Sequence, residues 1–429
     1  MDAVQKDPLL RTDHKSFNLL WSGQSLSLLG NQFMVIALPF LAVVTVGASA
    51  AEAVLLPFLM FVPFLAFGLP VGALIDRLPK RNTMILADLV QMLVYATIAL
   101  MAMGSMLTLP ILMGLILIAG TATVFFQVAY NSLLPEMYST ASDLQKGNAK
   151  LFFSESIART LGPIGAGPLI TVFGPPMAIL LNGCSFLISI LTLGAIRDAP
   201  VERAQNHAST ARRSIMADIK TGLEFVFSHP KLQPVFLCGA VYVLFLTVIE
   251  TSLVLYCKDI LLLAPSVIGL VIGAAAIGFP IANLIAARLL NHFGMARTLV
   301  IAAATSVSGL FLIAVFGASG SIAGLIAAGV LHGLGEGVFG PTSLTLRQTD
   351  TPSSLLGRVN SVQRFMIWGA IPLGSVMTSL IIKYIGLEWT LWVGGIGTAM
   401  CLIPLIRRGI LADLREPNTP FGTDSSHNR

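Results

Sequence analysis

The sequence predicts an all-α membrane protein with twelve transmembrane helices arranged as two six-helix bundles. Three observations support this fold class: the composition, a regular series of long apolar stretches, and the distribution of positive charge between them. Of the 429 residues, 11% are charged and 55% are hydrophobic, whereas soluble domains carry about 25% charged residues. So few charges cannot cover a soluble core, but they suit helices that satisfy their own backbone hydrogen bonds in lipid.

The apolar stretches are long enough to cross a bilayer, because about 30 Å of hydrocarbon takes roughly 20 helical residues. They lie near 17–46, 52–75, 82–104, 108–133, 148–173 and 176–196, and then near 233–257, 265–290, 295–317, 320–346, 357–384 and 388–406. We therefore predict an N-terminal bundle over 1–196, a cytoplasmic linker over 197–231, a C-terminal bundle over 232–410 and a flexible cytoplasmic tail over 411–429. The linker is expected to contain a helix along the membrane near 214–227.

Positive charge is concentrated on one side of this topology. With both termini inside, only Lys258 and Lys383 of the 26 Lys and Arg residues lie outside, which matches the excess of positive charge on cytoplasmic loops. The first residues also lack the basic patch and short apolar core of a signal peptide. We expect a multi-pass protein of the cell (inner) membrane with both termini in the cytoplasm.

The two halves resemble copies of one unit. Residues 131–134 match 342–345 about 210 positions later, and Gly147 matches Gly357 at the same offset. A duplicated six-span unit is typical of transporters that work by alternating access.

A charged turn between the second and third spans carries the most specific motif. Residues 72–81, GALIDRLPKR, resemble the signature loop G-x-L-x-D-R-x-G-R-R/K of the major facilitator superfamily, with Pro79 where many members have glycine. The resemblance implies the major facilitator fold, and a latch in which Asp76 meets the N-terminal end of the eleventh span around Gly357 through helix-dipole and ion-pair attraction. The alternative reading is charge that only sets topology. The gating set comprises Gly72, Asp76, Arg77, Lys80, Arg81 and Arg358.

The fifth span carries a second motif. Gly162, Pro163, Gly165 and Gly167 resemble the antiporter motif g-x-x-x-G-P-x-x-G-G of exporters, although Ala158 and Ala166 replace two of its glycines. Small residues let this span lie close against the other half, and proline bends the helix there. The alternative is an ordinary glycine-rich packing face.

Residues 17–32 resemble the first span of the branch that contains macrolide-efflux proteins and the enterobactin exporter. Many members of that branch carry Asp where this chain has Asn31, and the arginine that many proton-coupled exporters place in the fourth span is absent, because 115–134 holds no charge. The resemblance implies a proton-coupled exporter of amphipathic drugs, macrolide-like antibiotics or siderophores. An importer or a lysolipid flippase of the same fold remains open.

Ionisable residues inside spans are costly and are therefore functional candidates. His332 and Glu336 lie four residues apart on one helical face, so they can form a hydrogen-bonded pair that binds and releases a proton. Glu155 and Arg159 repeat this spacing, with a self-neutralising pair as the alternative. The proton-coupling candidates are His332, Glu336, Glu250, Glu155, Arg159 and Arg364, with the coupling carboxylate open between Glu336 and Glu250.

Amide and aromatic side chains of the central spans form a candidate substrate cavity that suits a bulky amphipathic solute. The set comprises Gln24, Asn31, Gln32, Phe33, Phe126, Gln127, Tyr130, Tyr242 and Trp368. Packing is the alternative role for each of them.

Other functional classes receive little support. Residues 335–340 read G-x-G-x-x-G but follow no strand, the four cysteines lack metal-ligand spacing, and only His332 of six histidines lies within a span. We therefore expect no enzyme, no metal, no cofactor beyond a proton gradient and no nucleic-acid partner. The expected partners of this monomer are a small-molecule substrate, protons and the lipid bilayer.

Overall fold

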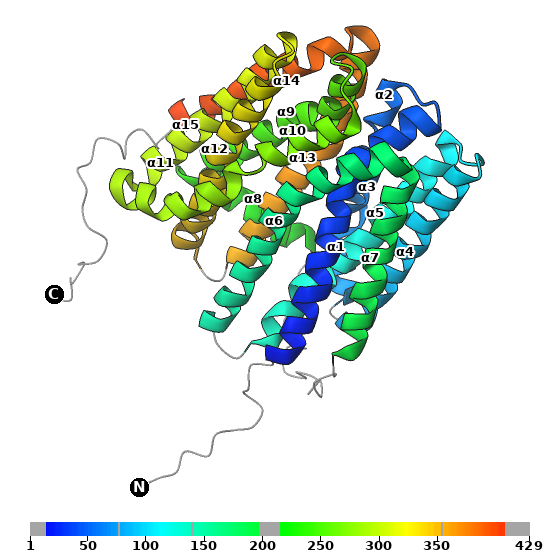
Figure 1. Cartoon of the computed structure of the whole chain (residues 1–429). Helices are drawn as coiled ribbons and strands as arrows, with labels where there is room; N and C mark the ends of the chain where they lie inside the picture. Colours follow the sequence, from blue (N-terminus) through cyan, green and yellow to red (C-terminus); the bar gives the residue numbers. More distant parts are fainter. Residues whose placement is uncertain (1–13, 76–77, 139–140, 197–214, 353–354, 408–429) are drawn as a thin grey trace, which may run out of the picture.

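The computed structural model describes residues 14–75, 78–138, 141–196, 215–352 and 355–407. Within these ranges the chain is helical and contains no strand, and ten stretches are long and apolar enough to cross a membrane. The helices form two groups, one before and one after residues 197–214 (Figure 1).

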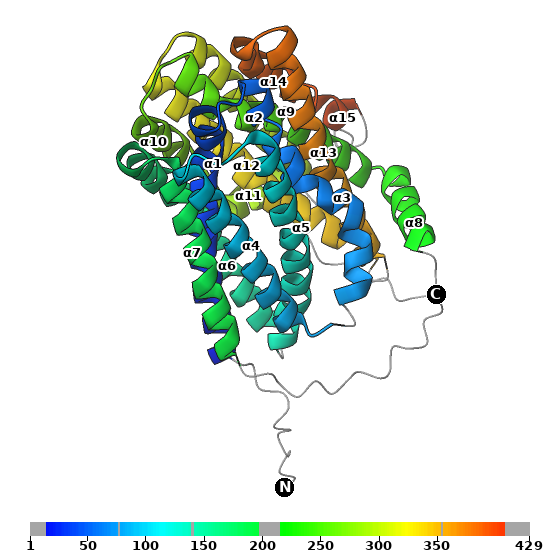
Figure 2. The same cartoon turned by 90° about the vertical axis from the view of Figure 1, so that its right-hand side faces the viewer.

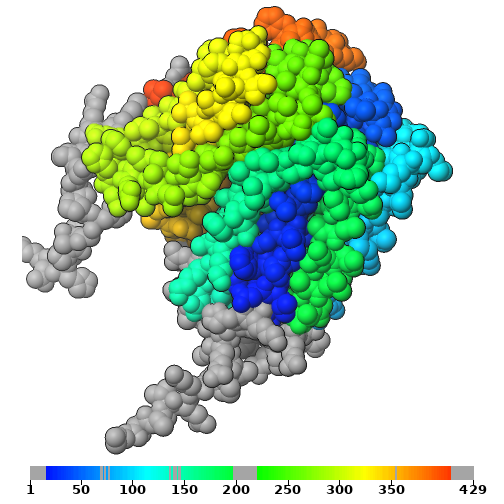
Figure 3. Space-filling view, viewed as in Figure 1, coloured from blue at the N-terminus to red at the C-terminus, as the bar shows by residue number. Residues whose placement is uncertain are grey.

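The first group comprises the helical elements before residue 197. It consists of α1 (His14–Phe40), the π-helical turn η2 (Leu41–Thr45), α2 (Ala50–Ala53), α3 (Leu56–Ile75), α4 (Lys80–Met103), α5 (Leu109–Leu133), η3 (Leu134–Met137), α6 (Ala141–Phe173) and α7 (Pro175–Ala195). α1 lies between α6 and α7, as the front face in Figure 3 shows, and α4 packs on both α5 and α7.

The second group contains α8 (Ile215–Ser228), α9 (Leu232–Asp259), α10 (Pro265–Ala275), α11 (Gly278–Ala318), α12 (Ile322–Asp350), α13 (Leu356–Tyr384), η5 (Leu387–Trp389), α14 (Thr390–Ala399) and α15 (Leu402–Arg407). α8 confirms the helix predicted near 214–227. It packs on the outside of the group, against the first turns of α13 (Figure 2).

The chain turns back on itself inside α11. Gly294 has φ 74° and ψ 170° there, a conformation that side chains with a Cβ rarely adopt. The Thr298 hydroxyl donates to the Leu289 carbonyl at 3.2 Å across this turn. α11 therefore contains two antiparallel segments, which agrees with the separate stretches predicted at 265–290 and 295–317.

Three predicted boundaries differ from the structure. α6 begins at Ala141 rather than near 148, because its first turns carry an Asp143–Lys146 ion pair at 3.1 Å and so lack an apolar pattern. The stretch 265–290 is interrupted after Ala275, and the stretch 388–406 is divided into η5, α14 and α15. Hydropathy finds the length of a stretch but not such local breaks.

The two groups share a hydrophobic core at one end only. We call this the upper end: it is where α1 and α6 end and α10 begins, at the top of Figure 1. There a single buried cluster joins Ala166 and Ile170 of α6 to Ile268 and Val271 of α10. Toward the opposite, lower end each buried cluster lies within a single group. The groups therefore pack together above and separate below.

Candidate functional site

Charged side chains from both groups meet near the middle of the molecule, just below the shared core. We define the central cluster as Glu155 and Arg159 of α6, Glu250 of α9, and His332 and Glu336 of α12. Arg159 interacts electrostatically with all three carboxylates, and Glu250 interacts with Glu336. The cluster holds three carboxylates against one guanidinium, so it carries excess negative charge that protons or a cationic group would neutralise.

A hydrogen-bond network surrounds the α12 members of the cluster. His332 Nε2 lies 3.4 Å from Glu336 Oε2. The Tyr242 hydroxyl donates to the same oxygen at 3.2 Å and lies 2.7 Å from the Ser306 hydroxyl. The Ser306 hydroxyl is in turn 2.9 Å from His332 Nδ1. The network thus closes a ring through α9, α11 and α12.

One arrangement of hydrogens that gives the contacts of this ring a donor begins at the imidazole, which also lies 3.1 Å from the Tyr242 hydroxyl through Nδ1. His332 Nδ1 donates to Ser306, Ser306 donates to Tyr242, and Tyr242 donates to Glu336. The remaining contact, from His332 Nε2 to Glu336, then needs a further proton, either on Nε2 or on the Glu336 carboxyl, because a neutral imidazole carries only one. The network is therefore complete when it holds one proton more than neutral His332 supplies.

Arg159 connects the first group to this network. Its Nη2 donates to Glu155 Oε1 at 3.1 Å, and its guanidinium lies over the Phe279 ring, 5.5 Å from the centroid. Phe279 places its ring at 87° to the His332 imidazole, with centroids 6.1 Å apart. A cation stacked on an aromatic face contributes about 0.5–2 kcal/mol, so Phe279 helps to hold Arg159 in place between the groups.

Water reaches these side chains although they lie deep in the molecule. The side chains of Arg159, Glu155 and Glu336 are 43%, 37% and 31% exposed, and Glu250 is exposed as well. Glu250 interacts with Glu336 and Arg159, so its side chain faces the interior. The central cluster therefore lines an opening between the two groups.

Above the cluster the groups are sealed by close helix contact between α6 and α10. A Cβ placed on Gly167 would lie 2.5 Å from the Pro265 carbonyl oxygen, and one on Gly269 would lie 2.3 Å from that of Pro163. Ser266 N also donates to the Thr171 hydroxyl at 3.2 Å. Small residues are thus required for this contact.

The remaining glycines of the antiporter motif lie elsewhere on α6. Gly162 faces Gln32 of α1, where an added Cβ would lie 2.3 Å from the Gln32 Cβ, whereas Gly165 has only Phe33 at 3.7 Å. The motif therefore packs α6 on one side against its own group and on the other against the second group.

The predicted gating turn is only partly described. Asp76 and Arg77 lie outside the described residues, so the latch stays a prediction. Arg81 donates from Nε to the Leu193 carbonyl at 2.7 Å and from Nη2 to that of Gly194 at 2.6 Å, which stabilises the C-terminal end of α7. Lys80 begins α4 and Gly72 lies within α3.

Arg358, the gating residue predicted on the eleventh span, lies in the first turn of α13. Its backbone is covered by α8, since a Cβ on Gly222 would lie 3.1 Å from the Arg358 carbonyl oxygen. The helix of the linker therefore packs on the segment to which the latch was assigned.

The candidate cavity residues divide between packing and open positions. Phe126 is buried and stacks on Tyr130 at 6.1 Å, and Trp368 contacts Phe64 of the first group edge-on at 4.3 Å. Gln24 is buried in α1, whereas Asn31 is exposed. Tyr242 belongs to the hydrogen-bond ring, Gln32 and Phe33 lie beside Gly162 and Gly165, and Gln127 is half-buried.

Two members of the site were not found from the sequence, and one predicted member lies away from it. Ser306 and Phe279 are ordinary residues of apolar spans, and no spacing rule links them to His332 on another helix. Arg364 forms no ion pair with Glu250 or Glu336 in the described ranges and instead lies in electrostatic range of Arg347. No group of three or more His, Cys, Asp and Glu side chains among the described residues could hold a metal ion.

Comparison with known proteins identifies the family. The family described as transmembrane secretion effector matches residues 8–416. The chain belongs to this family of the major facilitator superfamily. It is thus a multi-pass membrane transporter, and the resemblance drawn from its motifs is confirmed.

Members of this superfamily that resemble the chain include efflux pumps. It is 23% identical to macrolide efflux protein A of Streptococcus pyogenes over 405 residues, which cover 93% of this chain and 98% of that protein. It is 25% identical to the multidrug efflux pump Tap of Mycolicibacterium fortuitum over 367 residues, 84% and 88% of the two chains. Transport of the efflux type is therefore supported.

Solved structures of transporters share the fold. A bacterial homologue of the iron transporter ferroportin in an inward-facing state superposes with a TM-score of 0.72 at 16% identity, covering 92% of this chain and 99% of that one. The nucleoside transporter NupG gives 0.69 at 13% identity, covering 94% and 100%.

Proposed function

We propose that this transporter is a proton-coupled exporter of amphipathic small molecules that works by alternating access. The observation that carries the proposal is the central cluster, in which titratable side chains from both groups line one opening below a sealed helix contact. Such a site can bind either protons or a substrate, and its access depends on which end of the molecule is sealed.

The proposed topology has twelve spans in two six-helix bundles. Ten spans are long and apolar enough without α6. α6 adds one because its 33 residues exceed the bilayer thickness, and the reversal at Gly294 divides the segment Pro265–Ala318 into two. With the positive loops inside, the lower end faces the cytoplasm, and both termini of this inner-membrane monomer lie there.

In this topology the conformer is open to the cytoplasm and closed to the outside. An amphipathic solute enters from the cytoplasm, or from the inner leaflet, and reaches the central cluster. The α6–α10 contact then separates while the lower ends of the groups close. Rocking of two bundles around a midplane site is the usual way in which duplicated transporters alternate their access.

Antiport follows from the charge of the site. Glu250, Glu336 and Glu155 exceed the positive charge of Arg159, so protons and a cationic substrate compete for the same carboxylates. One proton that moves down one pH unit and about 100 mV releases about 3.7 kcal/mol, which supports a substrate gradient of several hundredfold.

The proposed substrates are bulky amphipathic compounds such as drugs, macrolide-like antibiotics or siderophores. Support comes from the names of the relatives and from aromatic residues such as Tyr130 and Trp368 near the interior of the bundle. A ring face accommodates varied apolar groups at little entropic cost, which suits a broad substrate range.

The test is uptake of a fluorescent amphipathic dye into inverted membrane vesicles with an imposed pH gradient, because an exporter moves its substrate into the lumen of such vesicles. We expect the native chain to move dye with the gradient, and either Glu336→Gln or Glu250→Gln to abolish the pH dependence. Arg288→Gln, an exposed change on α11, is the control and should transport as the native chain does.

Other outcomes reject the proposal in defined ways. Dye movement that ignores the pH gradient in the native chain excludes proton antiport. Accumulation in the opposite direction identifies an importer, and movement of lysolipid without any pH dependence identifies a flippase.

A further inference from the structure

A buried guanidinium near the lower end of α12 has no counter-charge. The Arg347 side chain belongs to a residue that is 8% exposed, and its Nε has no hydrogen-bond partner. Arg347 takes part in no ion pair within the described residues. A largely buried charge without a partner costs free energy, so this position favours a ligand that completes it.

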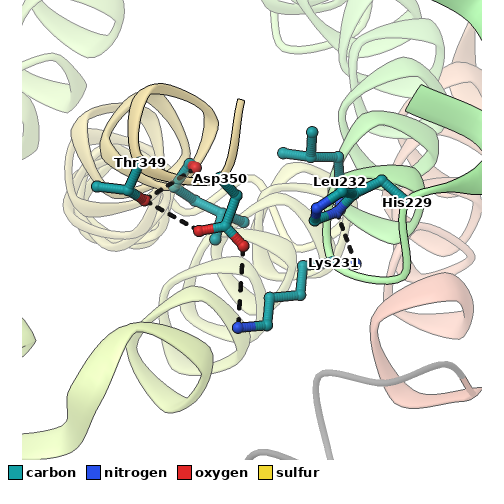
Figure 4. Close-up of polar contacts among 6 residues, drawn as sticks. His229, Lys231, Leu232, Thr349 and Asp350 are labelled. Atoms are coloured by element: carbon teal, nitrogen blue, oxygen red, sulfur yellow. Dashed lines mark hydrogen bonds and ion pairs between the residues drawn. The ribbon is translucent and has the colours of Figure 1, made fainter. Parts of the chain in front are cut away.

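The nearest acid along the helix is already occupied. Asp350 lies one turn beyond Arg347, but its Oδ2 is 3.8 Å from the Lys231 ammonium at the start of α9. Its Oδ1 accepts from the Thr349 hydroxyl at 3.1 Å. Figure 4 shows the Asp350 carboxylate turned toward Lys231 and Thr349. Arg347 therefore gains no neutralisation from it.

The surroundings of Arg347 are positive. Arg364 of α13, which is exposed, interacts unfavourably with Arg347 through its own positive charge. Two guanidinium groups that repel each other at the edge of a low-dielectric region attract an anion more strongly than either would alone.

A small cavity adjoins the guanidinium between α9, α12 and α13. It has a volume of about 30 Å³ and is lined by Arg347, Gln363, Ser343, Gly239 and Phe236, among others. The Gln363 amide makes no hydrogen bond in the described ranges, so its NH₂ group can donate to a ligand. Ser343 already donates to the Gly340 carbonyl at 2.9 Å, so it lines the cavity without donating to a ligand.

We propose that Arg347 and Gln363 form a binding subsite for the acidic group of a ligand, a carboxylate or a phosphate. Guanidinium binds oxyanions of this kind through two parallel hydrogen bonds. The cavity admits roughly one or two water-sized groups, which matches an oxyanion head while the rest of a larger ligand stays outside the cavity.

The subsite lies on the same helix face as the central cluster. Glu336 and Arg347 are eleven residues apart on α12, which corresponds to about 16 Å and about three turns, so both side chains point to one side. Phe339 and Ser343 lie between them. If the proposed transport path is correct, its substrate meets Arg347 first, and amphipathic acids or zwitterions become the favoured class. The binding of the anion itself does not depend on transport.

Thermal unfolding of the purified full-length chain tests this binding directly. In nanodiscs of phosphatidylcholine at fixed ionic strength, we expect benzoate to raise the melting temperature by a few degrees, whereas its neutral isostere benzamide does not. Arg347→Gln and Gln363→Leu should lose or halve the benzoate shift, Arg347→Lys should keep part of it, and Arg288→Gln should keep it whole.

A second readout separates binding from misfolding. Without any anion, Arg347→Gln should melt above the native chain, because it removes an unpaired buried charge. A variant that folds, melts higher and ignores benzoate supports the subsite. Equal shifts for benzoate and benzamide, or a full benzoate shift in Arg347→Gln, overturn it.

The lipid composition of the nanodisc distinguishes a lipid headgroup from a free small anion as the source of the acidic group. If phosphatidylglycerol in the nanodisc raises the melting temperature of the native chain, but not that of Arg347→Gln, and removes the benzoate shift, the subsite holds a lipid headgroup. If the benzoate shift is unchanged in phosphatidylglycerol, the ligand is a free small anion. Loss of proton coupling in the efflux assay leaves this binding result untouched, so the two proposals fail separately.

Discussion

At the scale of single residues, the hydrogen-bond ring makes Ser306 the most informative position. Ser306 is the only ring member without a titratable or aromatic group, yet it joins His332 Nδ1 at 2.9 Å to the Tyr242 hydroxyl at 2.7 Å. A hydroxyl can accept one hydrogen and donate another in the same ring. It can therefore pass protonation changes between His332 and Tyr242 without carrying charge itself.

We predict that Ser306→Ala reduces pH-driven dye efflux about tenfold while dye binding changes little. The substitution removes the Ser306 contacts to His332 Nδ1 and to the Tyr242 hydroxyl, at a cost of about 1–3 kcal/mol for the protonated ring. The measurement is the efflux rate in vesicles over a range of imposed pH gradients.

Ser308→Ala is the matched control for this change, since Ser308 lies exposed on the same helix. It should behave like the native chain. Equal efflux by both variants would show that the ring has no part in coupling.

Sequence reasoning recovers part of this site for an identifiable reason. The pairs His332–Glu336 and Glu155–Arg159 were predicted because residues four apart share a helical face, and the structure places both pairs in contact. Ser306 and Phe279 were missed because contacts between helices depend on their mutual rotation, which no local spacing encodes. The same limit hid Arg347, which within one sequence is only a charge near the end of a span.

At the scale of helices, the antiporter motif contains two glycines with different surroundings. A Cβ on Gly167 would lie 2.5 Å from the Pro265 carbonyl oxygen of α10, whereas a Cβ on Gly165 would meet only Phe33 at 3.7 Å. The first distance is far below van der Waals contact and involves backbone, which cannot move aside as a side chain can. The motif therefore has one position that the helix contact requires and another that it does not.

Gly167→Ala should therefore slow transport at least tenfold and weaken the conformer sealed at the upper end, whereas Gly165→Ala should be tolerated. Overpacking of this kind typically costs about 1–3 kcal/mol. Efflux rates and melting temperatures of the two variants, measured side by side, provide the check. Similar losses in both would indicate that the motif acts through the flexibility of α6 rather than through its contact with α10.

The turn inside α11 gives a second prediction at this scale. Gly294 adopts φ 74° and ψ 170° with nothing within 4 Å of an added Cβ, so the cost of Gly294→Ala is purely conformational. We expect about 1–3 kcal/mol of destabilisation, seen as a lower melting temperature. Gly340→Ala, a helical glycine with equally open surroundings, should leave stability unchanged or raise it.

The helices themselves were predicted well because bilayer thickness sets their length. The helix predicted near 214–227 was found as α8, Ile215–Ser228, and the stretch 82–104 as α4, Lys80–Met103. The early start of α6 and the interruption after Ala275 were missed, because neither changes the mean hydropathy of its stretch enough to be seen. Length is a collective property of a span, whereas a break depends on a few local contacts.

At the scale of the whole molecule, the distribution of the core describes one state of a moving protein. One buried cluster crosses between the groups at the upper end, and each of the other clusters lies within a single group. No pattern in a single sequence reports this, because an alternating-access chain encodes at least two packings with similar free energy. In this conformer the charges of the central cluster are therefore accessible only from the lower end.

A disulfide across the α6–α10 contact should hold the chain in that conformer. Ser266 N of α10 donates to the Thr171 hydroxyl of α6 at 3.2 Å across the seal, so we expect cysteines at the two positions to come within reach of a disulfide. In a chain whose four native cysteines are replaced, oxidation of Thr171→Cys/Ser266→Cys should stop efflux almost completely, and reduction should restore it. Either single cysteine variant should transport after the same oxidation, because it forms no cross-link. Efflux at the native rate by the oxidised double variant would mean that α6 and α10 never separate, and alternating access would then need a different pair of helices.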